Sequence, residues 1–253
     1  MHCIVLYVII FIFVIRFFIM QKNRSLLFIK LRDWNLNLYR KFLNNPAYLD
    51  VDEFFPEYKI LEDNWLVIRE EIYNIINNNN ISLPKFHDVD EGQEFISNND
   101  GVSWNMFLIK TYGFWNKKNI KLCPKTVNLF KPFKKVESIS VSILDPGKHI
   151  PAHNGPYKGI LRYQLALAVP KEGSCQIFVD NKPYSWTEGK SVLFDDTYVH
   201  EVKNETNEKR IALLLDIRRD DLPFFLKIYD YFLFKIIQLI VIANRTMEKS
   251  AVS

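Results

Sequence analysis

The spacing of apolar residues along this chain predicts which segments form helices and which form strands. Residues 61–75 carry an apolar residue at every third or fourth position, with charged residues between them, which is typical of an amphipathic helix. From Glu137 onward, short runs rich in Val, Ile, Leu and Tyr alternate with turn sequences such as DPGKH. Closely spaced short strands predict a mainly β fold with flanking helices, a cupin-like double-sheet jelly roll. The predicted strands are 138–144, 160–169, 175–180, 182–186, 190–194 and 210–217.

The segments before these strands have weaker patterns. Residues 81–104 are rich in Asp, Asn and Glu and are bounded by Pro and Gly, so we expect an irregular loop there. Residues 104–115 alternate enough to form a strand or a hairpin. Residues 122–130 predict a helix with Pro124 in its first turn, where proline is well tolerated.

Both ends of the chain are strongly apolar. No charged residue occurs from Cys3 to Ile15, and the apolar run resumes after Arg16. A bilayer core of ~30 Å needs about 20 mostly apolar helical residues, so residues 1–20 predict a single transmembrane anchor. Basic residues follow this segment and almost none precede it, which by the positive-inside rule predicts a cytosolic folded domain.

The pattern divides the chain into one domain with appendages. Residues 1–20 form the predicted anchor, 21–60 a connecting region, 61–222 the folded domain and 223–253 an apolar, membrane-associated tail. Three charged residues within the apolar run 224–243 of this tail, Lys227, Asp230 and Lys235, argue against a spanning helix. A helix in the plane of the membrane and a helix packed against the domain are equally compatible with the tail.

Composition excludes several classes of protein. The net charge of +4 in 253 residues is too small to indicate nucleic-acid binding, although it suits an anionic membrane surface. The three cysteines are widely spaced and form no CxxC pair, so neither a disulfide framework nor a cysteine metal site is expected.

Two histidines and an arginine carry the candidate chemistry. His153 and His200 are far apart in sequence, but ligands on two strands of a jelly roll can converge on one metal, and imidazole suits Fe(II). Arg210, beyond the second histidine, could hold an anionic co-substrate. The usual third ligand would be a carboxylate two residues after His153, where this chain has Gly155.

Four sequence phrases carry a resemblance to a known family. HIPAHNGPYKGILRYQLALAVP, WTEGK, FDDTYVHEV and RIALLLD occur in this order from His149 to Asp216. This combination resembles the aspartyl/asparaginyl β-hydroxylase family of Fe(II)/2-oxoglutarate dioxygenases, whose animal members also have glycine in an H-x-G-P motif. The resemblance covers roughly residues 50–222 and implies a double-stranded β-helix.

The resemblance implies a role for each matching residue. His153 and His200 would be the iron ligands, with water in place of the missing carboxylate. Fe(II) would be the cofactor, with 2-oxoglutarate and O2 as co-substrates. The distal carboxylate of 2-oxoglutarate would pair with Arg210, helped by Ser142. Further matches are Arg162, which would contact an acidic group of the substrate, and Gln164, which replaces a histidine near the co-substrate.

The segments at the ends of the domain and two phrases within it are similar to those of a second branch of this superfamily. The apolar ends and the phrases LEDNWLVIREE and LCPKTVNLF resemble the membrane-bound bacterial lipid A hydroxylases, which keep an H-x-D motif. We therefore expect hydroxylation of a C–H bond, with the β-carbon of Asp or Asn in a polypeptide favoured over the acyl chain of a membrane lipid. A non-catalytic jelly-roll binding module at a membrane is the alternative of another class. Asp195 and Asp196 are expected to shape a turn, and Trp186 to pack in the core.

Overall fold

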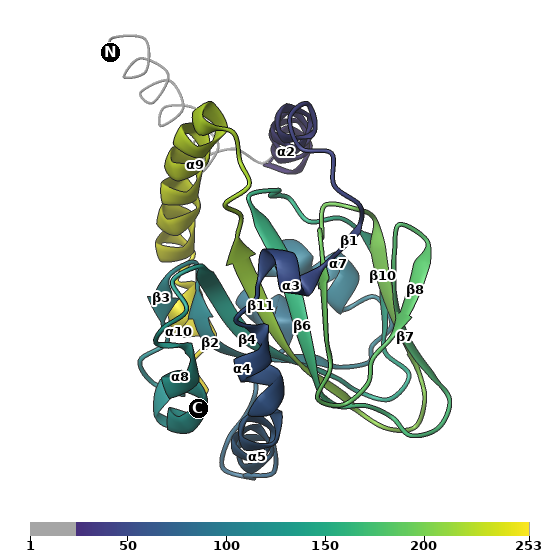
Figure 1. The fold of residues 1–253 in the computed structure, drawn as a ribbon. Helices are drawn as coiled ribbons and strands as arrows, with labels where there is room; N and C mark the ends of the chain where they lie inside the picture. Colours follow the sequence, from purple (N-terminus) through teal and green to yellow (C-terminus); the bar gives the residue numbers. More distant parts are fainter. Residues whose placement is uncertain (1–23, 253) are drawn as a thin grey trace.

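Two antiparallel β-sheets face each other in the computed structural model, which describes residues 24–252 (Figure 1). The larger sheet has seven strands in the order β1-β9-β6-β11-β4-β2-β3, and the smaller has four in the order β5-β10-β7-β8. This arrangement confirms the predicted mainly β, double-sheet fold. The strands are β1 (Tyr48–Leu49), β2 (Trp104–Thr111), β3 (Phe114–Trp115), β4 (Val136–Leu144), β5 (His149–His153), β6 (Ile160–Ala168), β7 (Ser174–Val179), β8 (Lys182–Ser185), β9 (Ser191–Phe194), β10 (His200–Glu205) and β11 (Arg210–Arg218).

The central strands of the larger sheet are buried on both faces because helices cover the outer face and the smaller sheet covers the inner one. On β11, Ile211, Leu213 and Leu215 belong to the outer apolar cluster, which also contains residues of α4, α5 and α8. The alternate residues, including Arg210 and Ala212, point to the space between the sheets, since side chains alternate along a strand. Apolar residues from both sheets, including Leu144 of β4 and Ile177 of β7, line that space.

The helices lie mostly before and after the strand-rich region. The predicted helix over 61–75 is present as two helices that meet at Asn64, and the predicted helix over 122–130 begins at Pro124. The α-helices are α2 (Arg24–Arg40), α3 (Val51–Phe54), α4 (Tyr58–Asp63), α5 (Trp65–Ile76), α6 (Phe86–Val89), α7 (Glu94–Ser97), α8 (Pro124–Phe130), α9 (Phe224–Ala243) and α10 (Thr246–Lys249), and single 3-10 turns span Glu91–Gln93 and Asn119–Lys121.

The expectation of an irregular loop over 81–104 is wrong. This segment contains α6, α7 and the 3-10 turn between them. Its acidic residues cap these short helices: the Asp88 carboxylate accepts a hydrogen bond from the Lys85 N–H, and the Asp90 carboxylate accepts one from the Gly92 N–H. Polar residues that are typical of loops are also the residues that satisfy free N–H groups at helix starts.

Residues of the predicted connecting region contact the domain at two places. β1 pairs with β9 at the edge of the larger sheet. The helix α2 packs against α9 through Tyr39, which is fully buried. The predicted anchor over residues 1–20 lies outside the described residues, and no helix within residues 24–252 is long and apolar enough to cross a membrane.

The tail helix α9 packs against the domain through a buried carboxylate. Asp230 is 1 % exposed and accepts hydrogen bonds from the hydroxyls of Tyr39 and Tyr157, both at 2.5 Å, and from the Arg218 guanidinium at 3.1 Å. These partners come from α2, the segment before β6 and the end of β11, so a single side chain ties α9 to three parts of the chain. The charge that argued against a spanning helix is the attachment point of a packed one.

Asp230→Ala is expected to destabilise the fold by about 3 kcal/mol, because it removes the closer of two acidic partners of Arg218 and leaves two buried hydroxyls without their acceptor. Urea unfolding of the full chain measures this loss. Asp220→Ala, which removes only an exposed ion pair with Lys135, is the matched control and should cost less than about 1 kcal/mol. Equal effects of the two substitutions would show that the buried carboxylate does not hold α9.

Candidate active site

His153 and His200 lie opposite each other at one end of the smaller sheet. His153 is the last residue of β5, His200 is the first of β10, and the two are paired in register with ring centroids 4.2 Å apart. The pairing shifts nearby, since Val202 pairs with Ile150, so three steps along β5 match two along β10. Ile150 faces the space between the sheets, and three regular steps would turn His153 outward. The bulge in β5 turns His153 back toward His200.

Both imidazoles are held in the same tautomer. The Nδ1 of His153 lies 2.7 Å from the Pro151 carbonyl oxygen, and the Nδ1 of His200 lies 2.9 Å from the Tyr198 carbonyl oxygen. A carbonyl only accepts, so Nδ1 carries the proton and Nε2 keeps a free lone pair. Burial lowers the pKa of both histidines, and together with the neighbouring His153 it brings the pKa of His200 to about 3. Neutral imidazoles with free Nε2 atoms fit a divalent metal ion.

Arg210 is a buried cation without an anionic partner. Its side chain, at the start of β11, lies between the sheets and is 1 % exposed. Its Nε and Nη1 atoms are buried and have no hydrogen-bond partner among the described residues. Burial lowers the pKa of Arg210 to about 10, so the group remains charged at neutral pH. An unpaired buried charge is costly, and an incoming carboxylate would relieve that cost.

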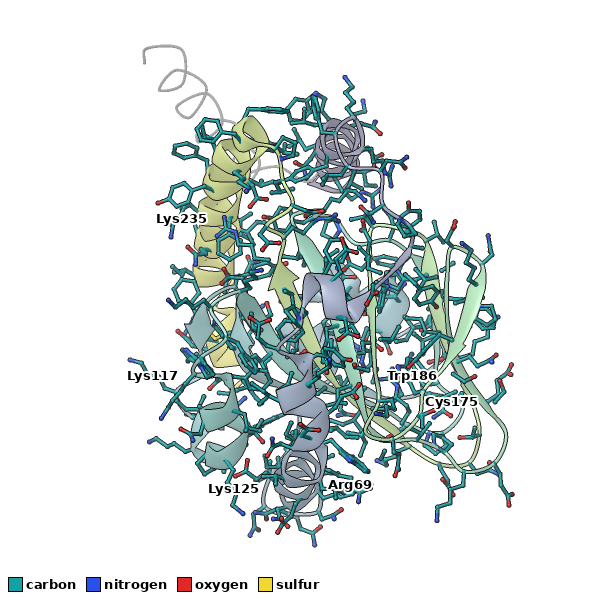
Figure 2. The ribbon with its side chains drawn as sticks, viewed as in Figure 1. Arg69, Lys117, Lys125, Cys175, Trp186 and Lys235 are labelled. Carbon is teal, nitrogen blue, oxygen red and sulfur yellow. The ribbon has the colours of Figure 1, made fainter. Side chains whose placement is uncertain are left out.

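An aromatic side chain and an amide hold the Arg210 guanidinium in place. The guanidinium carbon lies 4.6 Å from the centroid of the Trp186 ring, a cation–π distance (Trp186 is labelled in Figure 2). The Trp186 indole N–H donates to the Gln164 side-chain oxygen at 3.1 Å. Gln164, expected beside the co-substrate, therefore acts on Arg210 through Trp186. Trp186 does pack in the core as expected, but its ring also orients a charged group.

Ser142 lies on the inner face of β4, in register with Ala212 of β11. Its hydroxyl oxygen accepts a hydrogen bond from the Trp104 indole N–H at 2.9 Å, which leaves the hydroxyl hydrogen free to donate to an anion. Ser142, Ala166 and Ala212 give neighbouring strands small side chains facing the space between the sheets. Small side chains at these positions suit a bound organic acid.

Arg162 is paired with two buried carboxylates. Its guanidinium lies 3.2 Å from Asp196 and 3.1 Å from Asp216, and it is about one-quarter exposed, with 26 % of its side-chain surface accessible. Burial by itself lowers the pKa of Arg162, but the attraction of the two carboxylates is stronger, so the pKa is raised overall. Asp216 went unrecognised in the sequence, although its position six residues after Arg210 places it on the same face of β11. Arg162 therefore has its charge matched before any substrate binds.

Asp196 occupies the space that a side chain at Gly155 would need. A Cβ atom built on Gly155 would lie 2.4 Å from Asp196 Oδ1, and the Gly155 N–H donates to the Asp196 carbonyl at 2.7 Å. Asp196 Oδ1 is buried and has no hydrogen-bond partner among the described residues. Burial raises the pKa of Asp196 to about 6, against the opposing effect of Arg162. Asp196 was expected only to shape a turn. Its carboxylate also occupies the space that the Cβ atom of a carboxylate ligand at position 155 would need.

Gly155→Asp is expected to lower metal affinity, although it restores the usual ligand pattern, because the new Cβ collides with the Asp196 carboxylate. The double variant Gly155→Asp/Asp196→Gly removes the collision and should bind Mn(II) more tightly than the single variant, at least about tenfold by calorimetry. Gly155→Ala is the control for the collision alone. If Gly155→Asp by itself bound Mn(II) more tightly than the unchanged protein, the space would not be occupied as described.

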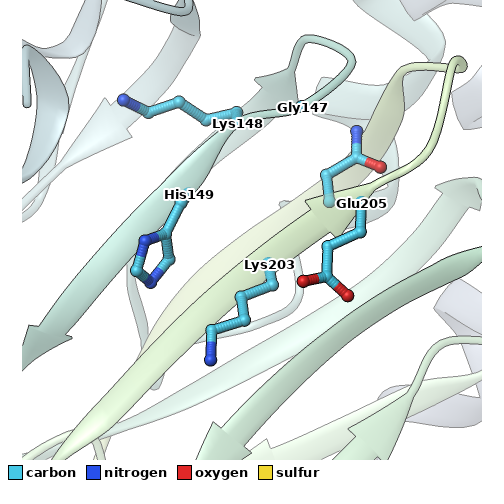
Figure 3. Close-up of a pocket in the computed structure, with 6 residues that line it drawn as sticks. Gly147, Lys148, His149, Lys203 and Glu205 are labelled. Atoms are coloured by element: carbon cyan, nitrogen blue, oxygen red, sulfur yellow. The ribbon is translucent and has the colours of Figure 1, made fainter. Parts of the chain in front are cut away.

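Two residues near the site face elsewhere. His149 is on the outer side of the smaller sheet, beside Lys203 on the neighbouring strand, and its Nε2 lies 3.2 Å from Glu201 (Figure 3). Asp195 is fully buried and forms ion pairs with Lys158 and Arg219, so it fixes the turn before His200. Among the described residues, no group of three His, Cys, Asp or Glu side chains is placed to hold a metal.

The chain is similar in sequence to one protein family and to several hydroxylases. Residues 62–220 match the family described as Aspartyl/Asparaginyl beta-hydroxylase. An ornithine lipid ester-linked acyl 2-hydroxylase from Rhizobium tropici is 36% identical over 183 residues, which cover 72% of this chain and 64% of that protein. The human aspartyl/asparaginyl beta-hydroxylase is 32% identical over 170 residues, which cover 65% of this chain and 21% of that protein.

A solved structure also matches at a low level. A Pseudomonas putida prolyl-4-hydroxylase shares 15% identity with a TM-score of 0.41, and the match covers 62% of this chain and 88% of that one. The matched region spans less than two thirds of the Rhizobium and human proteins. The family match nevertheless includes both histidines, Gly155 and Arg210. This chain belongs to the aspartyl/asparaginyl beta-hydroxylase family.

Proposed function

We propose that this protein is an Fe(II)- and 2-oxoglutarate-dependent hydroxylase that acts on the acyl chain of a membrane lipid. The main support for 2-oxoglutarate as co-substrate is Arg210, a fully buried guanidinium whose Nε and Nη1 have no partner among the described residues. One carboxylate of 2-oxoglutarate would satisfy both atoms, with the Ser142 hydroxyl as a further donor. When bound, iron together with 2-oxoglutarate and O2 would supply the oxidant for the C–H bond.

The residues of this chain would hold the iron and prepare its surroundings. His153 and His200 would bind through Nε2, because their Nδ1–H groups are already engaged with backbone carbonyls. The free Oδ1 of Asp196 would accept a hydrogen bond from a water molecule in the place of the missing carboxylate. Buried apolar residues such as Phe194, whose ring centroid is 5.7 Å from that of His200, would limit access of bulk water.

Two observations favour a lipid substrate over the polypeptide favoured by the sequence motif. An acidic substrate group needs a free cation, and Arg162, the residue expected to supply it, is already paired with Asp196 and Asp216. The relative with 36% identity is named for hydroxylation of an ester-linked acyl chain of ornithine lipid. An uncharged acyl chain needs no ion pair with Arg162, so it could bind while Arg162 stays paired with the two carboxylates.

A polypeptide is the second candidate, because the human relative is named for aspartyl and asparaginyl residues. Separate incubations of the full chain with ornithine lipid vesicles and with a library of Asp- and Asn-containing peptides would decide between them. The expected result is the mass of one added oxygen on the acyl chain of the lipid. Oxygen added to peptides alone would overturn the lipid assignment.

A charge-matched variant sharpens the comparison. Asp216→Asn frees one ion-pairing position of Arg162, and we expect it to improve turnover of an acidic peptide relative to lipid. The matched control is Asp220→Asn, whose carboxylate pairs with Lys135 on the surface. If Asp216→Asn left the ratio of peptide to lipid turnover unchanged, the paired state of Arg162 would not determine substrate choice.

A further inference from the structure

The outward face of α9 is largely apolar, and the exposed Lys235 lies within it. Six of its exposed apolar residues follow the spacing of a single helical face: the later five come four, seven, eight, fifteen and eighteen residues after the first. Phe225 and Ile240 are also exposed and lie beside this face. The opposite face is buried and contains Leu226, Asp230 and Phe234. A helix that packs on a globular domain normally turns polar residues to water, so this face departs from the usual pattern. The exposed apolar residues of this face are Phe224, Ile228, Tyr231, Phe232, Leu239 and Ile242.

The neighbouring helix α2 and Phe42, two residues after its end, extend this apolar surface. Trp34 is 58% exposed and packs edge-on against Tyr229 of α9, and Phe42 is 48% exposed with its ring centroid 4.6 Å from that of Phe225. Figure 1 shows α2 and α9 together at one end of the molecule, away from α5. The exposed aromatic residues of the two helices therefore form one surface, which we call the α2/α9 surface.

The charges around the α2/α9 surface are basic. Lys227 and Lys235 are exposed on α9, and Lys235 projects from the outer side of the helix (Figure 2). The only acidic residue of α9 is Asp230, which is buried and paired with Arg218. On α2, the acidic residue Asp33 is matched by Arg32, while Lys30 remains as an exposed cation. Aromatic and aliphatic residues with lysines and no free carboxylate suit an anionic lipid surface.

We propose that the α2/α9 surface docks on an anionic lipid bilayer. The chain that leads into α2 supports this occupant, because residues 3–15 contain no charged residue. Phenylalanine and isoleucine side chains of α9 would enter the interface between headgroups and acyl chains, and lysines would meet lipid phosphates. This assignment concerns binding alone, so its test is independent of the proposed hydroxylation.

Docking at this surface would bring lipid close to the candidate active site. The connection after α2 touches both α9, through Phe42, and the turn before His200, where the Tyr198 hydroxyl donates to the Asn45 carbonyl at 2.6 Å. Arg40 donates to the Thr197 carbonyl at 3.3 Å in the same turn. Val199, next to His200, is 59% exposed. A bilayer on the α2/α9 surface would thus lie beside the turn that leads into His200.

The test places a fluorophore on the proposed surface of the full chain. Phe232→Cys, labelled with an environment-sensitive dye, reports on α9, and Leu66→Cys on α5 is the matched control with a similarly exposed apolar residue. Both are made with Cys3→Ser, and Cys123 and Cys175 are buried. Exposed substitutions of this kind change stability by less than about 0.5 kcal/mol. The probe is a vesicle of phosphatidylcholine and phosphatidylglycerol, and flotation isolates vesicle-bound protein.

In vesicle-bound protein, we expect nitroxide-labelled lipids to quench the dye at position 232 and iodide in the water not to reach it. The dye at position 66 should show the reverse. A dye at 232 that stays open to iodide on bound protein, or a protein that does not float with vesicles, would overturn the proposal. Protection of the dye at 232 before vesicles are added would also overturn it, since another copy or the apolar N-terminal segment would then cover the surface.

Discussion

Replacing His153 and His200 together by alanine is expected to remove metal binding and to lower turnover at least about a thousandfold. The reason is the small number of ligands in the proposed iron site, where the two adjacent imidazoles would be the only ligands from the protein. Each single alanine variant should weaken Mn(II) binding, because one imidazole remains. The fold should survive, since the hydrogen bonds of both Nδ1 atoms go to carbonyls two residues away in the same chain segment.

Calorimetric titration with Mn(II) and measurement of succinate release test this prediction without confusing binding with activity. His149→Ala is the matched control, because His149 pairs with Glu201 on the outer side of the smaller sheet. Turnover by the double variant at a rate comparable to the unchanged protein would contradict an iron site at this pair.

Arg210→Met is expected to have opposite effects on stability and on co-substrate binding. Removing an unpaired buried charge should leave the free energy of unfolding unchanged or raise it by about 1–2 kcal/mol. The dissociation constant for 2-oxoglutarate should rise at least about 100-fold, because a buried charge-assisted pair contributes about 3 kcal/mol to binding. A purely structural role for Arg210 predicts the reverse, a loss of stability without a specific loss of binding.

Urea unfolding without ligand and calorimetric titration with 2-oxoglutarate measure the two effects. Trp186→Leu keeps the Arg210 charge but removes the ring beneath it, so its dissociation constant should rise by a smaller factor. Arg245→Met, which removes an exposed arginine paired with Glu248 in α10, should leave 2-oxoglutarate binding unchanged. A large loss of stability in Arg210→Met would contradict the description of Arg210 as unpaired.

The strands could be predicted from sequence because their signals are local. Short apolar runs separated by turn residues predicted β4, β6, β7 and β11 to within two residues at each end. The short helices between 81 and 104 could not be predicted in this way, since each is a single turn that depends on a cap or, as in α7, on burial of Ile96 and Ser97 in the domain. The packing of α9 also depends on Tyr39, Tyr157 and Arg218, which are distant in sequence, so local spacing left it open.

In the candidate site, too, local motifs could be predicted from sequence, whereas features that depend on strand pairing could not. Motif order pointed to His153, His200 and Arg210, and the structure places all three side chains between or at the end of the sheets. The bulge that turns His153 inward could not be located from sequence, because it depends on the pairing between β5 and β10, although Pro151 in β5 is typical of an edge strand or a bulge. Asp216 could have been recognised: an acid in an apolar strand, on the face shared with Arg210, indicates a buried partner.

The most direct test of the proposed chemistry couples co-substrate consumption to product. The full chain is incubated with Fe(II), 2-oxoglutarate and O2, with and without membrane lipid, and both succinate and the mass of the acyl chains are measured. We predict lipid-dependent release of succinate, with one oxygen atom gained by an acyl chain for each succinate formed. Succinate release no greater than that of the His153→Ala/His200→Ala variant, with either lipid or peptide present, would contradict the account.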